Sequence, residues 1–461
     1  MADTESDGPP TQRIERMARI GRLVAGQSAR AAGGRVVDRA RTPDRRKAAE
    51  SKRYAKIAEE VVDQLGTMKG AAMKIGQVVA SIDFPNLEQE DRDRLKAKLG
   101  ELRDQAPRVD FRQMEKLMRS EWGRKPAEVL AELDEDAAAA ASIGQVYKGV
   151  THEGREVAIK VQYPGIAEAV DSDLRAARVL LPLLKRLAPG LDGNALLAEL
   201  RERIGEELDY EIEAQNQRKL ARAWKGHPHV FVPGVDTELS TRRVLVTDWV
   251  DAKPFSAMQA QDDAGRDHIG EIMYRFFWAT AVEQGIALGD PHPGNMLLHE
   301  DGRLVMLDFG LLRVLPKDML KAEGEAYRAM VEHRPDDVVA AMHSLGYLKA
   351  DTDAEKFYEY MHLTGSWVWD VDQPFRLTGE YAQALGLELM RQQGSWDIVR
   401  TIDLPGPALL LRRMENLVFT VLCDLRAAAD WKALSDELRG GEPARTPLGL
   451  EHEAWREARA A

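Results

Sequence analysis

Two aspartates and one asparagine stand at fixed intervals in the second half of the chain, and they constrain the fold more than any other feature. Asp290 lies five residues before Asn295, and Asn295 lies thirteen residues before Asp308. The Asp-Pro and Pro-Gly pairs near them are ordinary turn signals, so a plain surface loop is the alternative. That alternative does not explain the two intervals. Because carboxylate and amide oxygens suit a hard cation, we predict that Asn295 and Asp308 hold Mg²⁺.

The same residues fit the pattern of a phosphotransfer site. The five-residue interval is that of a protein-kinase catalytic loop, and Asp308 begins the Asp-Phe-Gly motif that holds metal in that fold. Upstream, Val-Ala-Ile-Lys at 157–160 is typical of the strand that carries the phosphate-binding lysine. We therefore expect ATP and Mg²⁺ as cofactors, with Lys160 on the phosphates and Asp290 as the proton acceptor. A single lysine on a strand could also be a solvated edge charge, and the downstream residues argue against that.

Composition describes an ordinary globular chain of 461 residues, 44% hydrophobic and 30% charged. The formal net charge of −12 argues against general nucleic-acid binding. Cys423 is the single cysteine, which excludes a disulfide within the chain and favours a reducing compartment. No apolar run reaches the roughly 18 residues of a membrane span, and the first residues lack the features of a signal peptide. We expect a cytoplasmic protein.

Changes in composition and pattern divide the chain into five parts. Residues 1–12 are predicted to be a disordered tail, and residues 13–110 a helical extension with a basic segment. A lobe of sheet and helices is expected over 111–250, a helical lobe with the catalytic loop over 251–440, and a polar tail over 441–461. The fold class expected is α+β, with two lobes arranged as in an atypical protein kinase.

The basic segment over residues 13–56 holds eleven arginines and three lysines against four acidic residues. Apolar residues recur at helical spacing near its start, which predicts a basic amphipathic helix. One interpretation is peripheral attachment to the anionic inner face of a membrane. The alternative is a helix packed on the acidic remainder of the chain, or a solvated basic face, and most basic helices do not bind lipid.

The remaining periodicities give a coarse secondary-structure prediction. A hairpin is expected around the turn at residues 152–154, because apolar residues alternate on both sides of it. Further strands are expected over 230–232 and 244–249, and one β interruption around 295–308 breaks a mainly helical region that begins at 267. Helices are expected over 54–65, 68–81, 88–103, 112–122, 126–132, 164–186 and 195–223.

A run of five alanines before Ser142 occupies the place where a kinase has its glycine-rich loop. Glycines let the backbone close over phosphates, whereas the Cβ of alanine restricts φ. Alanine also favours helix, so a helical stretch is the alternative. We favour a loop, because the hairpin must begin by Gly144. The nucleotide contacts predicted in this region and beyond it are Ala139, Ala140, Ala141, Ser142, Ile143, Val146, Ala158, Lys160 and Leu297.

Five motifs in this order resemble those of the AarF/UbiB family of atypical kinases, which includes quinone-biosynthesis proteins of bacteria and mitochondria. The resemblance covers about residues 65–315, and the joint occurrence of the motifs is very specific. They are a K-x-G-Q signature with Lys74 and Gln77, the alanine loop, V-A-x-K-V-Q-x-P-G over 157–165, an E-x-D signature at Glu207 and Asp209 followed by Glu213 and Asn216, and the catalytic loop with its Asp-Phe-Gly motif.

The resemblance implies roles for residues that their pattern alone does not place. Lys160 resembles the phosphate-binding lysine, and Glu207 resembles its partner on a helix. Lys74 and Gln77 resemble residues of an N-terminal extension that folds over the active site and meets Glu207 and Asp209. Family members of this kind bind ATP and Mg²⁺ and hydrolyse ATP, and their extension occludes the place of a protein substrate. From the residues alone, Lys74 could equally be a surface lysine.

Departures from ordinary kinases narrow the function. No Ala-Pro-Glu motif follows Gly310 and no activation loop fits, which the family shares and which argues against peptide phosphorylation. The C-terminal membrane segments of some relatives are not expected here.

The leading hypothesis is an atypical-kinase ATPase that supports quinone, isoprenoid-lipid or other membrane-associated metabolism. Its expected partners are nucleotide and an anionic membrane surface or quinone-pathway proteins, with no nucleic acid. The alternatives are an ATP-dependent scaffold or switch without phosphotransfer, and a small-molecule kinase of the aminoglycoside or choline type.

Overall fold

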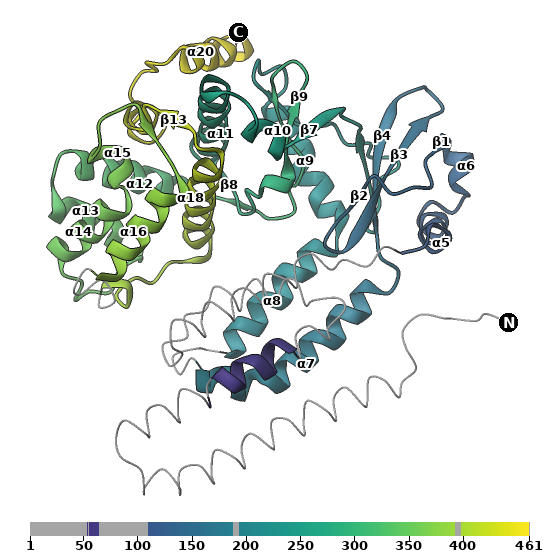
Figure 1. Ribbon diagram of the computed structural model, residues 1–461, viewed down its shortest axis with the longest axis horizontal. Helices are drawn as coiled ribbons and strands as arrows, with labels where there is room; N and C mark the ends of the chain where they lie inside the picture. The colour runs from purple at the N-terminus through teal and green to yellow at the C-terminus, as the bar shows by residue number, and fades with distance from the viewer. Residues whose placement is uncertain (1–52, 54, 64–108, 188–192, 392–397, 461) are drawn as a thin grey trace, which may run out of the picture. The chain divides into compact units, whose positions relative to one another are not determined.

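The structure is a computed structural model that describes residues 53, 55–63, 109–187, 193–391 and 398–460. The basic segment up to residue 52 and the predicted helices over 68–81 and 88–103, with Lys74 and Gln77, lie outside the described residues. The chain forms two compact units (Figure 1). Of the described residues, unit 1 contains those up to Ile212 and Asp236–Asp248, and unit 2 contains Glu213–Val235 and those from Trp249 onward.

Unit 1 is built on an antiparallel sheet in which the strand order is β1-β3-β4-β6 and β2 pairs with β3. Val157, Ile159 and Val161 of β4 are fully buried, because alternate residues of a strand face the same side. The antiparallel pairing of β3 with β4 confirms the hairpin that the sequence predicted. The strands are β1 (Leu130–Leu133), β2 (Ala139–Ala140), β3 (Gly144–Thr151), β4 (Glu156–Gln162) and β6 (Val244–Asp248).

In the part of the chain that the structure describes, residues 55–63 are helical and helices α5 to α9 follow. Helix α5 (Phe111–Trp122) begins at Asp110, whose carboxylate accepts a hydrogen bond from Arg112 N, and ends at Gly123 in the left-handed conformation. Helices α7 and α8 pack against each other, and the division between the units passes through α9. The other helices are α6 (Pro126–Val129), α7 (Ile166–Leu187), α8 (Gly193–Glu207) and α9 (Tyr210–Ala223).

Two predicted helices differ from the structure, one at its end and one in its middle. The helix expected over 126–132 stops at Val129, because Leu130 is buried and pairs with Thr151 as the first residue of β1. The helix expected over 195–223 is broken at residues 208–209. There Tyr210 N donates to Arg242 O, and Asp209 Oδ1 accepts from Glu211 N at 3.0 Å, so a new helix starts.

Unit 2 contains the other β segments that the structure describes. A four-stranded sheet has the order β5-β10-β9-β7, in which β5 and β10 run parallel and the other pairs run antiparallel. Two short ribbons pair β8 with β11 and β12 with β13. The strands are β5 (Val230–Phe231), β7 (Ala252–Pro254), β8 (Ile286–Leu288), β9 (Met296–His299), β10 (Leu304–Met306), β11 (Leu312–Val314), β12 (Phe375–Arg376) and β13 (Ala428–Ala429).

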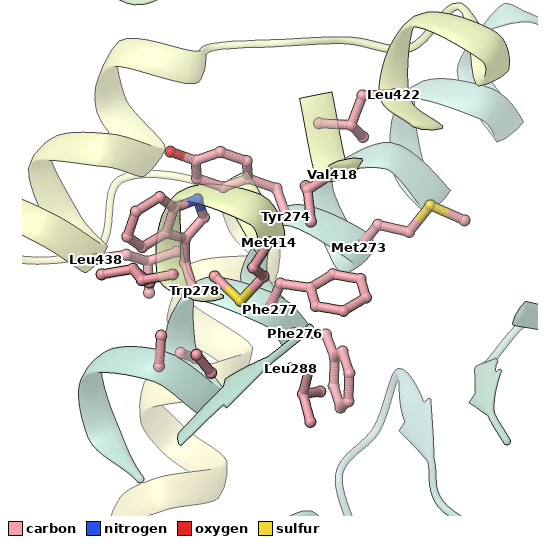
Figure 2. Packing of buried hydrophobic residues seen from close by; sticks show 14 of the residues in the cluster. Met273, Tyr274, Phe276, Phe277, Trp278, Leu288, Met414, Val418, Leu422 and Leu438 are labelled. Atoms are coloured by element: carbon pink, nitrogen blue, oxygen red, sulfur yellow. The ribbon is translucent and has the colours of Figure 1, made fainter. Parts of the chain in front are cut away.

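The core of unit 2 is centred on α11 (Asp263–Glu283), which is buried on nearly all sides over residues 269–281. Figure 2 shows its aromatic residues packed with Met414 and Val418 of α18 (Gly406–Leu425) and with Leu288 of β8. Among the described helices, none is long and apolar enough to cross a membrane. The remaining helices are α10 (Phe255–Gln259), α12 (Lys317–Val331), α13 (Pro335–Ser344), α14 (Ala354–Thr364), α15 (Ser366–Trp369), α16 (Gly379–Arg391), α19 (Trp431–Ser435), the π-helical turn η2 (Asp436–Gly440) and α20 (Pro447–Ala460).

Candidate active site

The β9–β10 hairpin explains the thirteen-residue interval between Asn295 and Asp308. Its register pairs Met296 with Met306, so the residues just before β9 and just after β10 lie at the same end. Leu307 N donates a hydrogen bond of 3.0 Å to Asn295 O and extends the ladder by one step. The hairpin therefore brings the two predicted metal ligands together at its open end.

The segment that contains Asp308 is held by its own backbone and by α9. Asp308 Oδ1 accepts from Gly310 N at 2.9 Å, which orients the carboxylate. Phe309 is buried at 1% exposure, and its carbonyl accepts from Asn216 Nδ2 at 2.9 Å. Asn216 follows the E-x-D motif in the sequence, and in the structure it holds the backbone of Phe309 within unit 2.

The loop with Asp290 closes on itself through short-range hydrogen bonds. His292 N donates to Asp290 O at 2.8 Å, and Asn295 N donates to His292 O at 2.9 Å within the short helical turn η1 (Pro293–Asn295). The amide Nδ2 of Asn295 lies 3.4 Å from Asp290 O as a donor. Because the nitrogen of this amide faces the carbonyl, its oxygen is the atom that faces elsewhere and can serve a cation. The Asp290 side chain is 35% exposed.

Arg413 is a site residue that the sequence motifs missed. It lies on α18, and its Nε donates to Gly289 O at 2.7 Å, while Nη2 lies 3.7 Å from Asp290 Oδ1. No motif pointed to it, because α18 reads as an ordinary apolar helix far downstream of the catalytic loop. Tertiary packing alone brings this arginine to Asp290.

In unit 1, the predicted nucleotide contacts line up across three strands. The register places Ala139 of β2 opposite Val146 of β3, and Val146 opposite Lys160 of β4. Directly paired residues project from the same face of a sheet, so these three side chains share one face. Ala158 lies on that face too, two residues from Lys160 along β4. The alanine segment forms a strand and a turn rather than the alternative helix.

The neighbours of this row differ in exposure. Ala140 and Ser142 are exposed and Ala141 is half-buried, whereas Ile143 is buried at 4% exposure. At Gly144 a Cβ atom would lie 2.2 Å from Val161 O, so the turn after the alanines requires glycine. Leu297 belongs to unit 2, where it pairs with Val305 in the β9–β10 hairpin.

Lys160 lies near the junction of α8 and α9 within unit 1. Its Nζ is 5.0 Å from the centre of the Tyr210 ring, a distance at which a cation is attracted to an aromatic face. Glu207 is the last residue of α8, three positions before Tyr210. Asp209 Oδ2 lies 3.7 Å from Arg242 Nε. The predicted contact of Lys74 and Gln77 with Glu207 and Asp209 lies outside the described residues.

These features define the class of the protein as a kinase-like α+β fold with a lysine strand in one unit and a catalytic loop and Asp-Phe-Gly motif in the other. A family model described as the ABC1 atypical kinase-like domain matches residues 101–341. The chain belongs to this family, the AarF/UbiB atypical kinases that the sequence motifs indicated. The expected fold class is confirmed.

Similar proteins place the chain among named atypical kinases. "Atypical kinase COQ8B, mitochondrial" of Rattus norvegicus is 31% identical over 343 residues, which cover 73% of this chain and 62% of the relative. "Protein ACTIVITY OF BC1 COMPLEX KINASE 8, chloroplastic" of Arabidopsis thaliana is 30% identical, over 66% of this chain and 40% of the relative. An uncharacterised Synechocystis protein, sll0005, is 33% identical over 55% of this chain and 38% of its own length. The chain therefore spans less than two thirds of these curated relatives.

One solved structure is similar over most of the chain. It is the complex of Rv3197 with erythromycin from Mycobacterium tuberculosis, which is 30% identical with a TM-score of 0.62. The similarity covers 84% of this chain and 97% of that one. The agreement extends beyond the kinase-like domain and supports the same family.

Proposed function

We propose that this chain binds ATP with Mg²⁺ and hydrolyses ATP as an atypical kinase-like enzyme. The observation that carries the proposal is the open end of the β9–β10 hairpin, where the Leu307–Asn295 hydrogen bond holds the Asn295 and Asp308 segments together. The loop of Asp290 closes directly onto Asn295. A pair of metal ligands beside a proton acceptor is the arrangement that phosphoryl transfer requires.

The donor chemistry of this site fits Mg²⁺. Asn295 offers an amide oxygen and Asp308 a carboxylate, both hard oxygen ligands. Among the described residues, no group of three His, Cys, Asp or Glu side chains gathers for a metal, which fits an ion that takes phosphates and water as its other ligands. Bound there, Mg²⁺ would neutralise negative charge on the phosphates.

The residues of the chain would act on ATP in distinct ways. Lys160 would hold the α- and β-phosphates, and Glu207 would orient Lys160. Asp290 would accept a proton from an attacking water. The water oxygen forms a bond to the γ-phosphorus while the bond from that phosphorus to the β,γ-bridging oxygen breaks, which yields ADP and phosphate. A hydroxyl of an acceptor molecule could take the place of the water, and this gives the transferase form of the same reaction.

We also propose that the K-x-G-Q extension regulates ATP hydrolysis. If Glu207, Asp209, Asp290 and Asp308 all act on one nucleotide, their carboxylates would repel one another, and the cation of Lys74 would offset part of that repulsion. Lys74→Ala should change the rate of ATP hydrolysis or autophosphorylation without unfolding the chain. Wild-type turnover and wild-type nucleotide affinity in that variant would defeat this role.

The setting that we propose is quinone, isoprenoid-lipid or other membrane-associated metabolism, in the cytoplasm with peripheral attachment to a membrane. Support comes from the family and from the basic segment over residues 13–56. Deleting residues 1–50 should weaken sedimentation with anionic liposomes and leave nucleotide binding intact. Each basic residue near such a surface contributes up to about 1 kcal/mol, so the loss should shrink as salt rises. Absence of liposome binding by the full chain at low salt would contradict this setting.

Thermal unfolding tests the nucleotide site. Mg²⁺ with ATP should raise the melting temperature of the wild-type chain, because a ligand that binds only the folded state stabilises it. Asp308→Asn should abolish that rise. Glu300→Gln is the matched control, since Glu300 is an exposed carboxylate in the turn at the other end of the same hairpin. An unchanged rise in Asp308→Asn would remove the metal assignment.

A further inference from the structure

Helix α18 packs directly against the backbone of the catalytic loop. A Cβ atom on Gly289 would lie 2.5 Å from Leu410 Cδ1 of α18 and 2.6 Å from Leu311 Cδ2, so a larger residue there would have to displace these two leucine side chains. Gly289 N donates to Leu311 O at 2.9 Å. The residue before Asp290 is therefore clamped between α18 on one side and the strand segment after Gly310 on the other.

Arg413 extends this contact to Asp290 itself. It follows Leu410 by three residues, so both side chains project from one face of α18. The guanidinium donates from Nε to the carbonyl of Gly289 at 2.7 Å and brings Nη2 to 3.7 Å from Asp290 Oδ1. The planar guanidinium thus contacts both the backbone carbonyl just before Asp290 and the Asp290 carboxylate. The side chain of Arg413 is 37% exposed and that of Asp290 is 35% exposed, and an ion pair this exposed contributes little to the stability of the fold.

The preceding residue, Arg412, shows that the two arginines serve different purposes. Arg412 contacts Glu323 of α12 and lies 2.6 Å from Glu415 Oε2, and its side chain is 18% exposed. Glu415 in turn accepts from Arg439 at 3.1 Å. This half-buried network fixes α18 to α12 and to η2. These contacts hold the backbone of α18 in place where Arg413 extends to the catalytic loop.

We propose that Arg413 is a positioning residue for Asp290, an inference that rests on the proposed ATP hydrolysis. The bond to Gly289 O fixes the guanidinium, and its second branch sets the direction of the Asp290 carboxylate. A carboxylate held in one orientation keeps an oxygen aimed at the nucleophile's proton, and a misplacement of a reacting group by about 1 Å can reduce a rate by about 100-fold. The cation also offsets the charge of Asp290 near the phosphates.

The test compares Arg413→Gln, Arg413→Lys and Asn416→Ala in the full-length chain, by ATP hydrolysis and by the thermal shift with Mg²⁺ and ATP. Asn416 is exposed on the same helix and serves as the control. Arg413→Gln should lower kcat by about 10- to 100-fold with KM for ATP changed by less than about threefold. Arg413→Lys should have a rate between those of the wild type and Arg413→Gln, because lysine keeps the positive charge but lacks the paired N–H donors of the guanidinium.

A double-variant comparison separates positioning from general support. If Arg413 acts through Asp290, then adding Arg413→Gln to Asp290→Asn should change the residual rate by less than about twofold. Equal losses in the presence and absence of Asp290 would overturn the inference, as would wild-type kcat in Arg413→Gln. If the Gln variant does not fold, Arg413→Lys with wild-type kcat overturns it instead.

Failure of the proposed function gives a different result. In that case the wild-type chain itself would show neither a thermal shift with Mg²⁺ and ATP nor phosphate release. If the wild type hydrolyses ATP and Asp290→Asn does not, while Arg413→Gln matches the wild type, only the role of Arg413 is wrong.

Discussion

Asn216 of α9 donates a hydrogen bond of 2.9 Å to the carbonyl of Phe309, so a helix fixes the backbone beside the predicted metal ligand Asp308. Phe309 is itself almost fully buried. The position of Asp308 therefore depends on a neutral side chain that would not contact the metal.

Replacing Asn216 with Ala should weaken Mg²⁺-dependent nucleotide binding without unfolding unit 2. A neutral hydrogen bond contributes about 0.5–1.5 kcal/mol, so the dissociation constant for ATP with Mg²⁺ should rise by about 2- to 10-fold. Titration calorimetry checks this. Gln215→Ala, at the exposed neighbouring position on α9, is the control. An unchanged dissociation constant in Asn216→Ala would show that this bond does not support the metal segment.

The alanine segment offers a second prediction. Ala139 shares the face of the sheet that carries Val146 and Lys160. Ala139→Gly or Ala140→Gly should loosen the segment towards a glycine-rich loop and change nucleotide affinity or autophosphorylation, because glycine reaches backbone conformations closed to alanine. Ala131→Gly, at an exposed position on β1, should leave both unchanged. Identical nucleotide affinity in all three variants, with no change in autophosphorylation, would argue against contact between this segment and the phosphates.

The proximity of Asn295 and Asp308 and the strand that carries Lys160 could be predicted from the sequence because local order determines them. The interval from Asn295 to Asp308 is the length of one hairpin, and alternation over 157–161 describes one strand with a buried face. Arg413 could not be predicted, since its contact with Asp290 depends on how α18 packs against Gly289. Long-range pairing also explains the wrong helix over 126–132.

A cluster of histidines in unit 2 predicts acid sensitivity. His227 Nε2 lies 3.1 Å from His452 Nδ1 of α20, and burial, together with His452, His229 and Arg275, lowers the pKa of His227 to about 3. The cluster also includes His229 beside Glu451, at 2.6 Å, and His452 beside Glu283, at 3.1 Å. The ring of Trp455 of α20 stacks on that of Trp224, the residue after α9, with 5.6 Å between the ring centres, so this cluster joins α20 to the segment that follows α9.

The direction of the pH effect follows from proton uptake. Because the pKa of His227 is lower in the folded state than its ordinary value of 6.5, the unfolded chain binds this proton more readily. The contribution of uncharged His227 to the free energy of unfolding is complete above about pH 6.5. It is lost progressively as the pH falls towards 3, with a loss of about 2 kcal/mol at about pH 5. Denaturant unfolding of wild type and His227→Gln at several pH values measures it. The variant should show a shallower decline, and His152→Gln, at an exposed turn, should follow the wild type. Parallel curves for wild type and His227→Gln would contradict the prediction.

Phosphate release from ATP tests the central claim most directly. Wild-type chain and Asp290→Asn are first shown to bind ATP with Mg²⁺, and release is then followed in a single turnover with enzyme in excess. The account predicts slow release by the wild type and a loss of about 10²- to 10⁴-fold in Asp290→Asn, the range that a proton-accepting residue contributes. Equal release by the two proteins would contradict it. Tight binding by the wild type with no release would instead make the chain an ATP-dependent switch.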